Sequence, residues 1–71
     1  MIKDPVEQTS EYQNISNEVD EETNKILSEQ SIPKTRGYIN KFWALKKQIL
    51  KNKHNLNWKT PAEMNPGILF D

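Results

Sequence analysis

The sequence predicts a small all-α protein built on a helical hairpin. Apolar residues recur at three- and four-residue steps over about residues 37–53, which indicates an amphipathic helix. An acidic segment over about residues 17–30 precedes it, and Pro33 separates the two. The chain has 71 residues, of which only 34% are hydrophobic, so one marginal core is the most that it can bury.

The first helix is predicted from its N-terminal signals. Asn17 is a candidate N-cap, and the acids that follow it favour the positive end of the helix dipole. The apolar stripe of this helix is thin and consists of Val19, Ile26 and Leu27. Residues 1–14 show no apolar periodicity, so we expect a flexible tail there and a single helical unit over residues 15–71.

The second helix has the clearest pattern in the chain. Its apolar positions are Tyr38, Ile39, Phe42, Trp43, Leu45, Ile49 and Leu50. Asparagine, glutamine and lysine occupy the other side, and the poor helix formers at 52–55 end it. We expect the two helices to pair antiparallel, with the acids of the first facing the lysines of the second.

A third, short helical turn is predicted over about residues 61–65. Thr60, Pro61 and Glu63 combine an N-cap residue, a proline at the first helical position and the glutamate of a capping box. The sequence Asn65-Pro66-Gly67 stops this turn after a few residues.

Charge is strongly segregated along the chain although the net charge is zero. Residues 1–30 carry eight acids and two lysines, a balance of −6, and residues 31–62 carry eight bases and no acid, a balance of +8. Such asymmetry accompanies contacts with nucleic acid, membrane surfaces or charged proteins. The two halves can equally neutralise each other within the molecule, because closing so short a chain costs little entropy.

The composition argues against an enzyme. The chain has no cysteine, two glycines and a single histidine, His54, which removes thiolate chemistry, phosphate-binding glycine loops and most zinc sites. The acids at 20–22 fit a solvated helix start better than a metal site. We therefore expect no catalytic residues, no metal and no cofactor.

The sequence also bears on location and source. The first residues lack the apolar stretch of a secretory signal, and no segment approaches the length of a membrane span, so we expect an intracellular protein. Nine lysines against one arginine, with eight asparagines and seven isoleucines, indicate an AT-rich genome, such as that of a phage, a low-GC bacterium or an organelle. A virion component would fit that origin.

The functional expectation is a small accessory protein that docks onto a larger assembly. The sequence contains more large apolar side chains than so short a chain can bury. Apolar patches that stay exposed mark partner surfaces. The candidate partner-binding residues are Phe42, Trp43, Ile49, Leu50, Trp58, Ile68, Leu69 and Phe70. The simplest competing interpretation is that the aromatic residues of the second helix form the protein's own core.

The main alternative function is nucleic-acid binding by the lysine-rich helix. Its candidate phosphate contacts are Lys41, Lys46, Lys47, Lys51 and Lys53. The near absence of arginine weakens this alternative, because arginine is the preferred reader of base edges. A basic amphipathic helix of the membrane-surface or calmodulin-binding type stays open as a third interpretation.

The C-terminal segment carries a separate prediction. The turn at Asn65-Pro66-Gly67 leaves Ile68, Leu69 and Phe70 as an extended apolar run. The run is either a docking peptide for a partner or a segment that folds back onto Trp58 and the basic helix.

Overall fold

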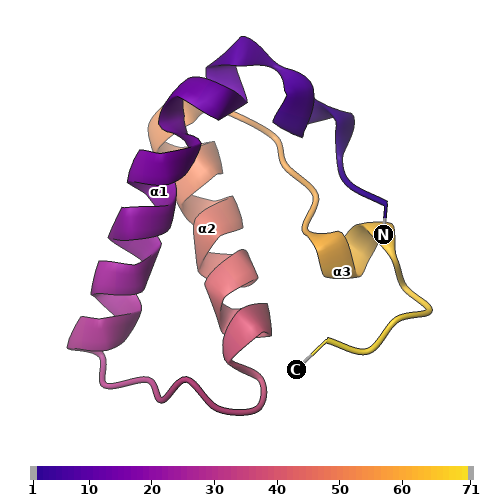
Figure 1. Ribbon diagram of the computed structural model, residues 1–71. Helices are drawn as coiled ribbons and strands as arrows, with labels where there is room; N and C mark the ends of the chain where they lie inside the picture. The colour runs from indigo at the N-terminus through magenta and orange to yellow at the C-terminus, as the bar shows by residue number, and fades with distance from the viewer. Residues whose placement is uncertain (1, 71) are drawn as a thin grey trace.

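A computed structural model describes residues 2–70, and all of the regular structure within that range is helical. Its elements are η1 (Pro5–Gln8), α1 (Ser10–Glu29), α2 (Tyr38–His54) and α3 (Pro61–Met64). Figure 1 shows α1 and α2 as an antiparallel hairpin, with α3 and the two ends of the chain to one side of α2. The predicted all-α hairpin is confirmed.

The second and third predicted helices are close to their observed bounds. Helix α2 begins after Gly37, whose φ of 85° lies in the left-handed region that favours glycine, and it ends before Asn55, its C-cap, whose φ is 50°. Helix α3 has the complete capping box: the Thr60 side chain accepts from the Glu63 N–H, and the Glu63 carboxylate accepts from the Thr60 N–H. Both helices therefore follow from local signals.

The first helix begins seven residues earlier than predicted. The predicted flexible tail over 1–14 differs from the structure, in which η1 and the first turns of α1 occupy residues 5–14. Thr9, not Asn17, is the N-cap, and its hydroxyl accepts from the Tyr12 N–H at 3.3 Å. Tyr12 is only 6% exposed, so packing holds this turn in place. Met1 of the predicted tail, like Asp71 at the other end, lies outside the described residues.

The connection between α1 and α2 starts with a Schellman-type turn. Ser31 has a left-handed φ of 57°. Its N–H donates to the Ser28 carbonyl, and the Ile32 N–H donates to the Leu27 carbonyl, both at 3.0 Å. The turn satisfies carbonyls at the end of α1 and directs the chain back toward α2.

The core lies between α1, α2 and the segment that follows α2. Its buried apolar side chains are Tyr12, Val19, Leu27, Ile49, Leu50, Leu56 and Trp58. Tyr12 and Trp58 stack with ring centroids 6.5 Å apart, which ties the start of α1 to residues 46 positions later in the chain. Within residues 2–70, no helix has both the length and the apolar character needed to cross a membrane.

Candidate functional site

Lys46 is a core residue, which corrects its predicted role as a phosphate contact. It is 7% exposed, and its ammonium donates to the Tyr12 hydroxyl at 2.7 Å and lies 2.9 Å from an Asp20 carboxylate oxygen. The same ammonium lies 4.9 Å from the centroid of the Trp58 ring and 5.1 Å from that of Tyr12. Such a position over two aromatic faces is a favourable cation–π geometry.

The surroundings of Lys46 keep it charged. Burial lowers the pKa of Lys46, because a charged group loses hydration in the core. The hydrogen bonds to Tyr12 and Asp20, with the attraction of these two groups, outweigh that effect and raise the pKa above its ordinary value of 10.5. Lys46 therefore connects α1 to α2 as a cation at neutral pH.

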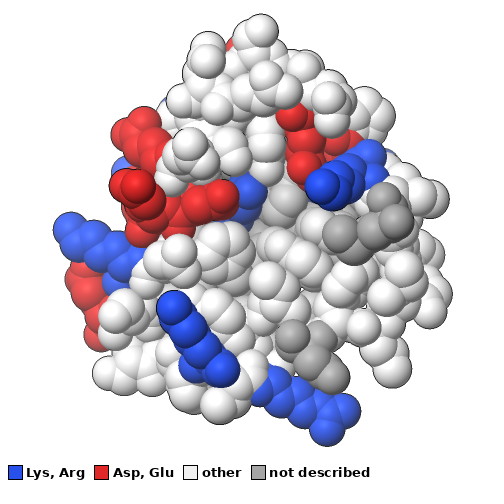
Figure 2. Space-filling model, in the orientation of Figure 1, with Lys and Arg blue, Asp and Glu red and all other residues white. Residues whose placement is uncertain are grey.

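Two more of the five predicted phosphate contacts are held in ion pairs. Lys47 lies 2.7 Å from the Glu63 carboxylate of α3, and Lys53 lies 2.7 Å from Glu22 of α1. Lys41 and Lys51 are exposed. Figure 2 shows acidic and basic side chains lying beside one another at several places on the face in view, with no broad area of a single sign. The segregated charges of the sequence thus meet in space, with acids of α1 facing lysines of α2.

The predicted partner-binding residues fall into two groups. Ile49, Leu50 and Trp58 are 7%, 0% and 3% exposed, so they stabilise the fold and are removed from the candidate surface. Ile49 and Leu50 belong to the core cluster that α2 forms with Tyr12 and Val19 of α1, and Trp58 is buried because the segment after α2 folds against Tyr12. Phe42 and Trp43 are half-buried on α2.

The C-terminal segment combines both of its predicted alternatives. Phe70 folds back, but onto Trp43 instead of Trp58: the two rings meet edge to face at 4.9 Å, and the Asn40 side chain donates to the Phe70 carbonyl at 3.0 Å. Leu69 points into solvent and is 96% exposed, and Ile68 is 49% exposed. The segment is attached at Phe70 and presents Leu69 outward.

Asn65, which sequence analysis treated only as a turn residue, joins the two ends of the described chain. Its amide donates to the Ile2 carbonyl at 2.6 Å, and its oxygen accepts from the Ile2 N–H at 2.8 Å. The Asn65 carbonyl also accepts from the Ile68 N–H at 3.0 Å. Ile2, which is 62% exposed, and Ile68, which is 49% exposed, are thereby both bonded to Asn65. We call the group Ile2, Ile68 and Leu69 the apolar patch.

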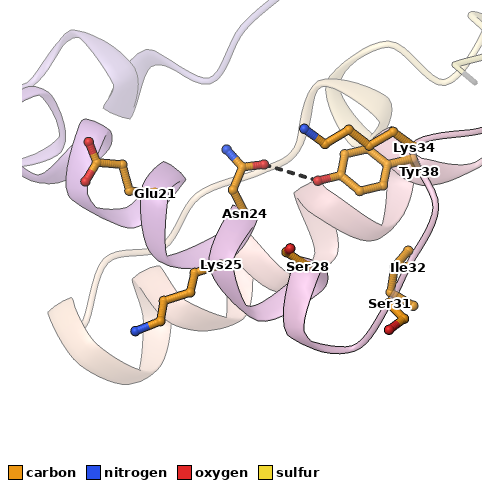
Figure 3. Close-up of a pocket in the computed structure, with 8 residues that line it drawn as sticks. All are labelled: Glu21, Asn24, Lys25, Ser28, Ser31, Ile32, Lys34 and Tyr38. Atoms are coloured by element: carbon orange, nitrogen blue, oxygen red, sulfur yellow. Dashed lines mark hydrogen bonds between the residues drawn. The ribbon is translucent and has the colours of Figure 1, made fainter.

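A polar groove lies at the other end of the hairpin, beside the α1–α2 connection. Figure 3 shows its lining residues, which are Glu21, Asn24, Lys25, Ser28, Ser31, Ile32, Lys34 and Tyr38. It holds about 660 Å³, and the Tyr38 hydroxyl donates to the Asn24 side-chain oxygen across it at 3.1 Å. Its charges are of both signs and its side chains do not converge on one point, so we assign it no chemistry.

Among the described residues, no three histidine, aspartate or glutamate side chains lie close enough together to hold a metal ion. Two members of the 20–22 acid cluster, Asp20 and Glu22, are the ion-pair partners of Lys46 and Lys53.

Comparisons with protein-family models, with curated proteins and with solved structures find no match to this chain. The candidate site accordingly rests on the geometry of the apolar patch.

Proposed function

We propose that this chain is a non-enzymatic interaction protein that docks onto a larger protein through the apolar patch. The observation that carries the proposal is the 96% exposure of Leu69 on a segment that is anchored on both sides. Ile68 is bonded to Asn65 on one side, and Phe70 is bonded to Asn40 on the other. A leucine held in place in this way has already lost part of the freedom that binding would otherwise remove.

The size of the patch constrains the kind of interface. Complete burial of its three side chains from their present exposures would contribute about 3–6 kcal/mol, at about 1.5–3 kcal/mol for each fully exposed side chain. Association costs roughly 4–15 kcal/mol in lost translational and rotational freedom. A stable complex therefore needs contacts beyond the patch, and the half-buried rings of Trp43 and Phe70 adjoin it.

Nucleic-acid binding is the weaker candidate. Of the five lysines proposed for it, Lys46 is buried, and Lys47 and Lys53 are paired with carboxylates. Binding through Lys41 and Lys51 alone would contact about two phosphates. The slope of log affinity against log salt would then be only about −1.8 on duplex DNA, at about −0.9 for each phosphate.

The docking proposal is tested by affinity capture of the intact chain from a lysate of its source cells. We expect a stoichiometric protein partner with the wild-type chain and a loss of that partner with Leu69→Asp. Ser10→Asp serves as the matched control, because it adds the same charge at an exposed position where an acid suits the helix dipole.

Circular dichroism checks that both variants keep the wild-type helicity, so that loss of capture reports on the surface. Capture of the same partner by Leu69→Asp at wild-type yield would overturn the role of the patch. Recovery of nucleic acid with no stoichiometric protein would overturn the proposed function itself.

A further inference from the structure

A second surface feature lies close to the apolar patch: an open groove between α2, the segment that follows it and α3. The groove holds about 390 Å³ and is lined by Asp4, Lys47, Lys51, Leu56, Asn57, Trp58, Lys59 and Glu63. Leu56 and Trp58 are buried residues whose edges reach this surface, so part of its lining is apolar. None of the roles described above uses the groove.

The acids of the groove are already engaged. The two carboxylate oxygens of Asp4 accept from the backbone N–H groups of Val6 and Lys59, at 3.0 and 2.8 Å. Glu63 accepts from Lys47 and from the Thr60 N–H. The Glu63 carboxylate is therefore paired with a cation, whereas the Asp4 carboxylate, which accepts only from neutral N–H groups, keeps its negative charge.

Two of the lysines are not engaged. Within residues 2–70, the ammonium groups of Lys51 and Lys59 have no hydrogen-bond or ion-pair partner, and both residues are exposed. Since Lys47 is matched by Glu63, the two unpaired ammonium groups outweigh the single charge of Asp4, and the groove has a net charge of +1 beside an apolar floor. That combination suits an anionic group attached to an apolar body.

The groove lies close to Ile2, one member of the apolar patch. Asp4 lines the groove and Ile2 belongs to the patch, so two peptide units separate them and their Cα atoms lie at most about 7 Å apart. Both positions are fixed, because Ile2 is bonded to Asn65 of the cap of α3 and Asp4 is bonded to the Lys59 N–H. One partner segment can therefore cover both.

We propose that the groove binds an acidic side chain flanked by large apolar residues in a segment of the docking partner. The inference rests on the proposed function and specifies the chemistry of the partner. The partner carboxylate pairs with Lys51 and Lys59, and the apolar neighbours contact the edges of Leu56 and Trp58. These contacts supply the interactions that the apolar patch alone lacks, and an open groove leaves room for a continuing chain.

The experiment uses the intact, isotope-labelled chain and a blocked Leu-Glu-Leu-Glu peptide as the ligand, followed by nuclear magnetic resonance. We expect shifts at the Asn57 and Lys59 amides and at the Trp58 indole N–H. The double variant Lys51→Gln/Lys59→Gln should weaken binding at least tenfold, equivalent to about 1.4 kcal/mol. The matched control Lys34→Gln/Lys41→Gln removes the same charge outside the groove and should bind as the wild type does.

Several outcomes overturn the proposal. The first is that millimolar peptide causes no shifts at these groups. The second is that a Leu-Gln-Leu-Gln peptide causes equal shifts. Either result shows that the groove does not select a carboxylate. A third is tighter binding of an oligothymidylate, which would assign the lysines to nucleic acid. Any of these results, combined with capture that still depends on Leu69, would remove the groove proposal and leave the proposed function standing.

Discussion

The two tryptophans of this protein lie in opposite kinds of environment, although each is paired with one aromatic ring. Trp58 is 3% exposed, stacks on Tyr12, and donates its indole N–H to Glu7 at 3.0 Å. Trp43 is half-buried and is covered by Phe70 from the C-terminal segment. The difference lies in what covers each ring: a long helix with its own hydrogen bonds in the first case, and a short extended segment in the second. We call the surroundings of Trp58 and Tyr12 the Trp58 region, and those of Trp43 and Phe70 the Trp43 region. We infer that the Trp58 region stabilises the fold and that the Trp43 region is available to a partner.

The largest expected effect separates the two regions directly. Trp58→Ala removes a fully buried aromatic side chain, which costs about 3–5 kcal/mol. That is comparable to the whole stability of a domain of this size. We expect the variant to be unfolded by circular dichroism at 25 °C.

Trp43→Ala provides the matched comparison. This ring is half-buried, so we expect the free energy of unfolding to fall by about 1–2 kcal/mol. The loss combines the energy of the aromatic pair with part of the energy of burying the ring. Equal losses for the two tryptophan variants in urea unfolding would contradict the distinction between the two regions.

A second prediction concerns the buried cation of the Trp58 region. Lys46→Ala leaves Asp20 without its partner and opens a cavity beside Tyr12. We expect these two changes to lower the free energy of unfolding by about 2–3 kcal/mol. This value lies below the roughly 3–5 kcal/mol of a fully buried pair, because the Asp20 side chain is 39% exposed, and water that enters the vacated space can reach its buried oxygen.

The pH dependence of stability follows from the raised pKa of Lys46. A group whose pKa is higher in the folded state stabilises the fold fully below its unfolded pKa of about 10.5. That contribution is lost as the pH rises through the folded value. We expect the melting temperature of the wild-type chain to fall above pH 10.5 more steeply than that of Lys46→Met, and parallel curves would show that Lys46 does not connect the two helices.

A smaller effect is expected at α3, which lies between Trp58 and Phe70 in the chain. The Lys47 ammonium and the Thr60 N–H, both donating to its carboxylate, hold the pKa of Glu63 below its ordinary value of 4.5. Its stabilisation is therefore present above pH 4.5 and is lost as the pH falls through the lower, folded pKa. Glu63→Gln keeps the capping box and removes only the ion pair, so we expect a loss of at most about 1 kcal/mol at neutral pH. Acid titrations of both chains, followed by circular dichroism, should converge below that pKa.

The sequence predicts those parts of the fold whose causes are local. The spacing of apolar residues marks α2, and Thr60, Pro61 and Glu63 mark α3, because each pattern is complete within a few turns of chain. The first turns of α1 were missed because Tyr12 is an isolated apolar residue among polar ones. Its partners, Lys46 and Trp58, lie 34 and 46 residues away.

The same limit applies to the candidate site. Lys46 resembles its exposed neighbours in a lysine-rich segment, and only the closing of the hairpin places it between Tyr12 and Trp58. Asn65 has the sequence of an ordinary turn residue, and its role in holding Ile2 depends on the other end of the chain. For the run at 68–70 the sequence leaves docking and folding back open, and the structure divides the run, with Leu69 exposed and Phe70 packed on Trp43.

Urea unfolding tests the division between the two regions most directly. It compares the wild-type chain with Leu69→Asp, each with and without the captured partner. We expect the two free chains to agree within about 0.5 kcal/mol, as for a surface substitution. Partner at 100 times its dissociation constant should stabilise the wild type by about 2.7 kcal/mol and leave the variant unchanged. A free variant that is destabilised by much more than that, or a partner that stabilises both chains equally, would contradict the assignment of Leu69 to binding.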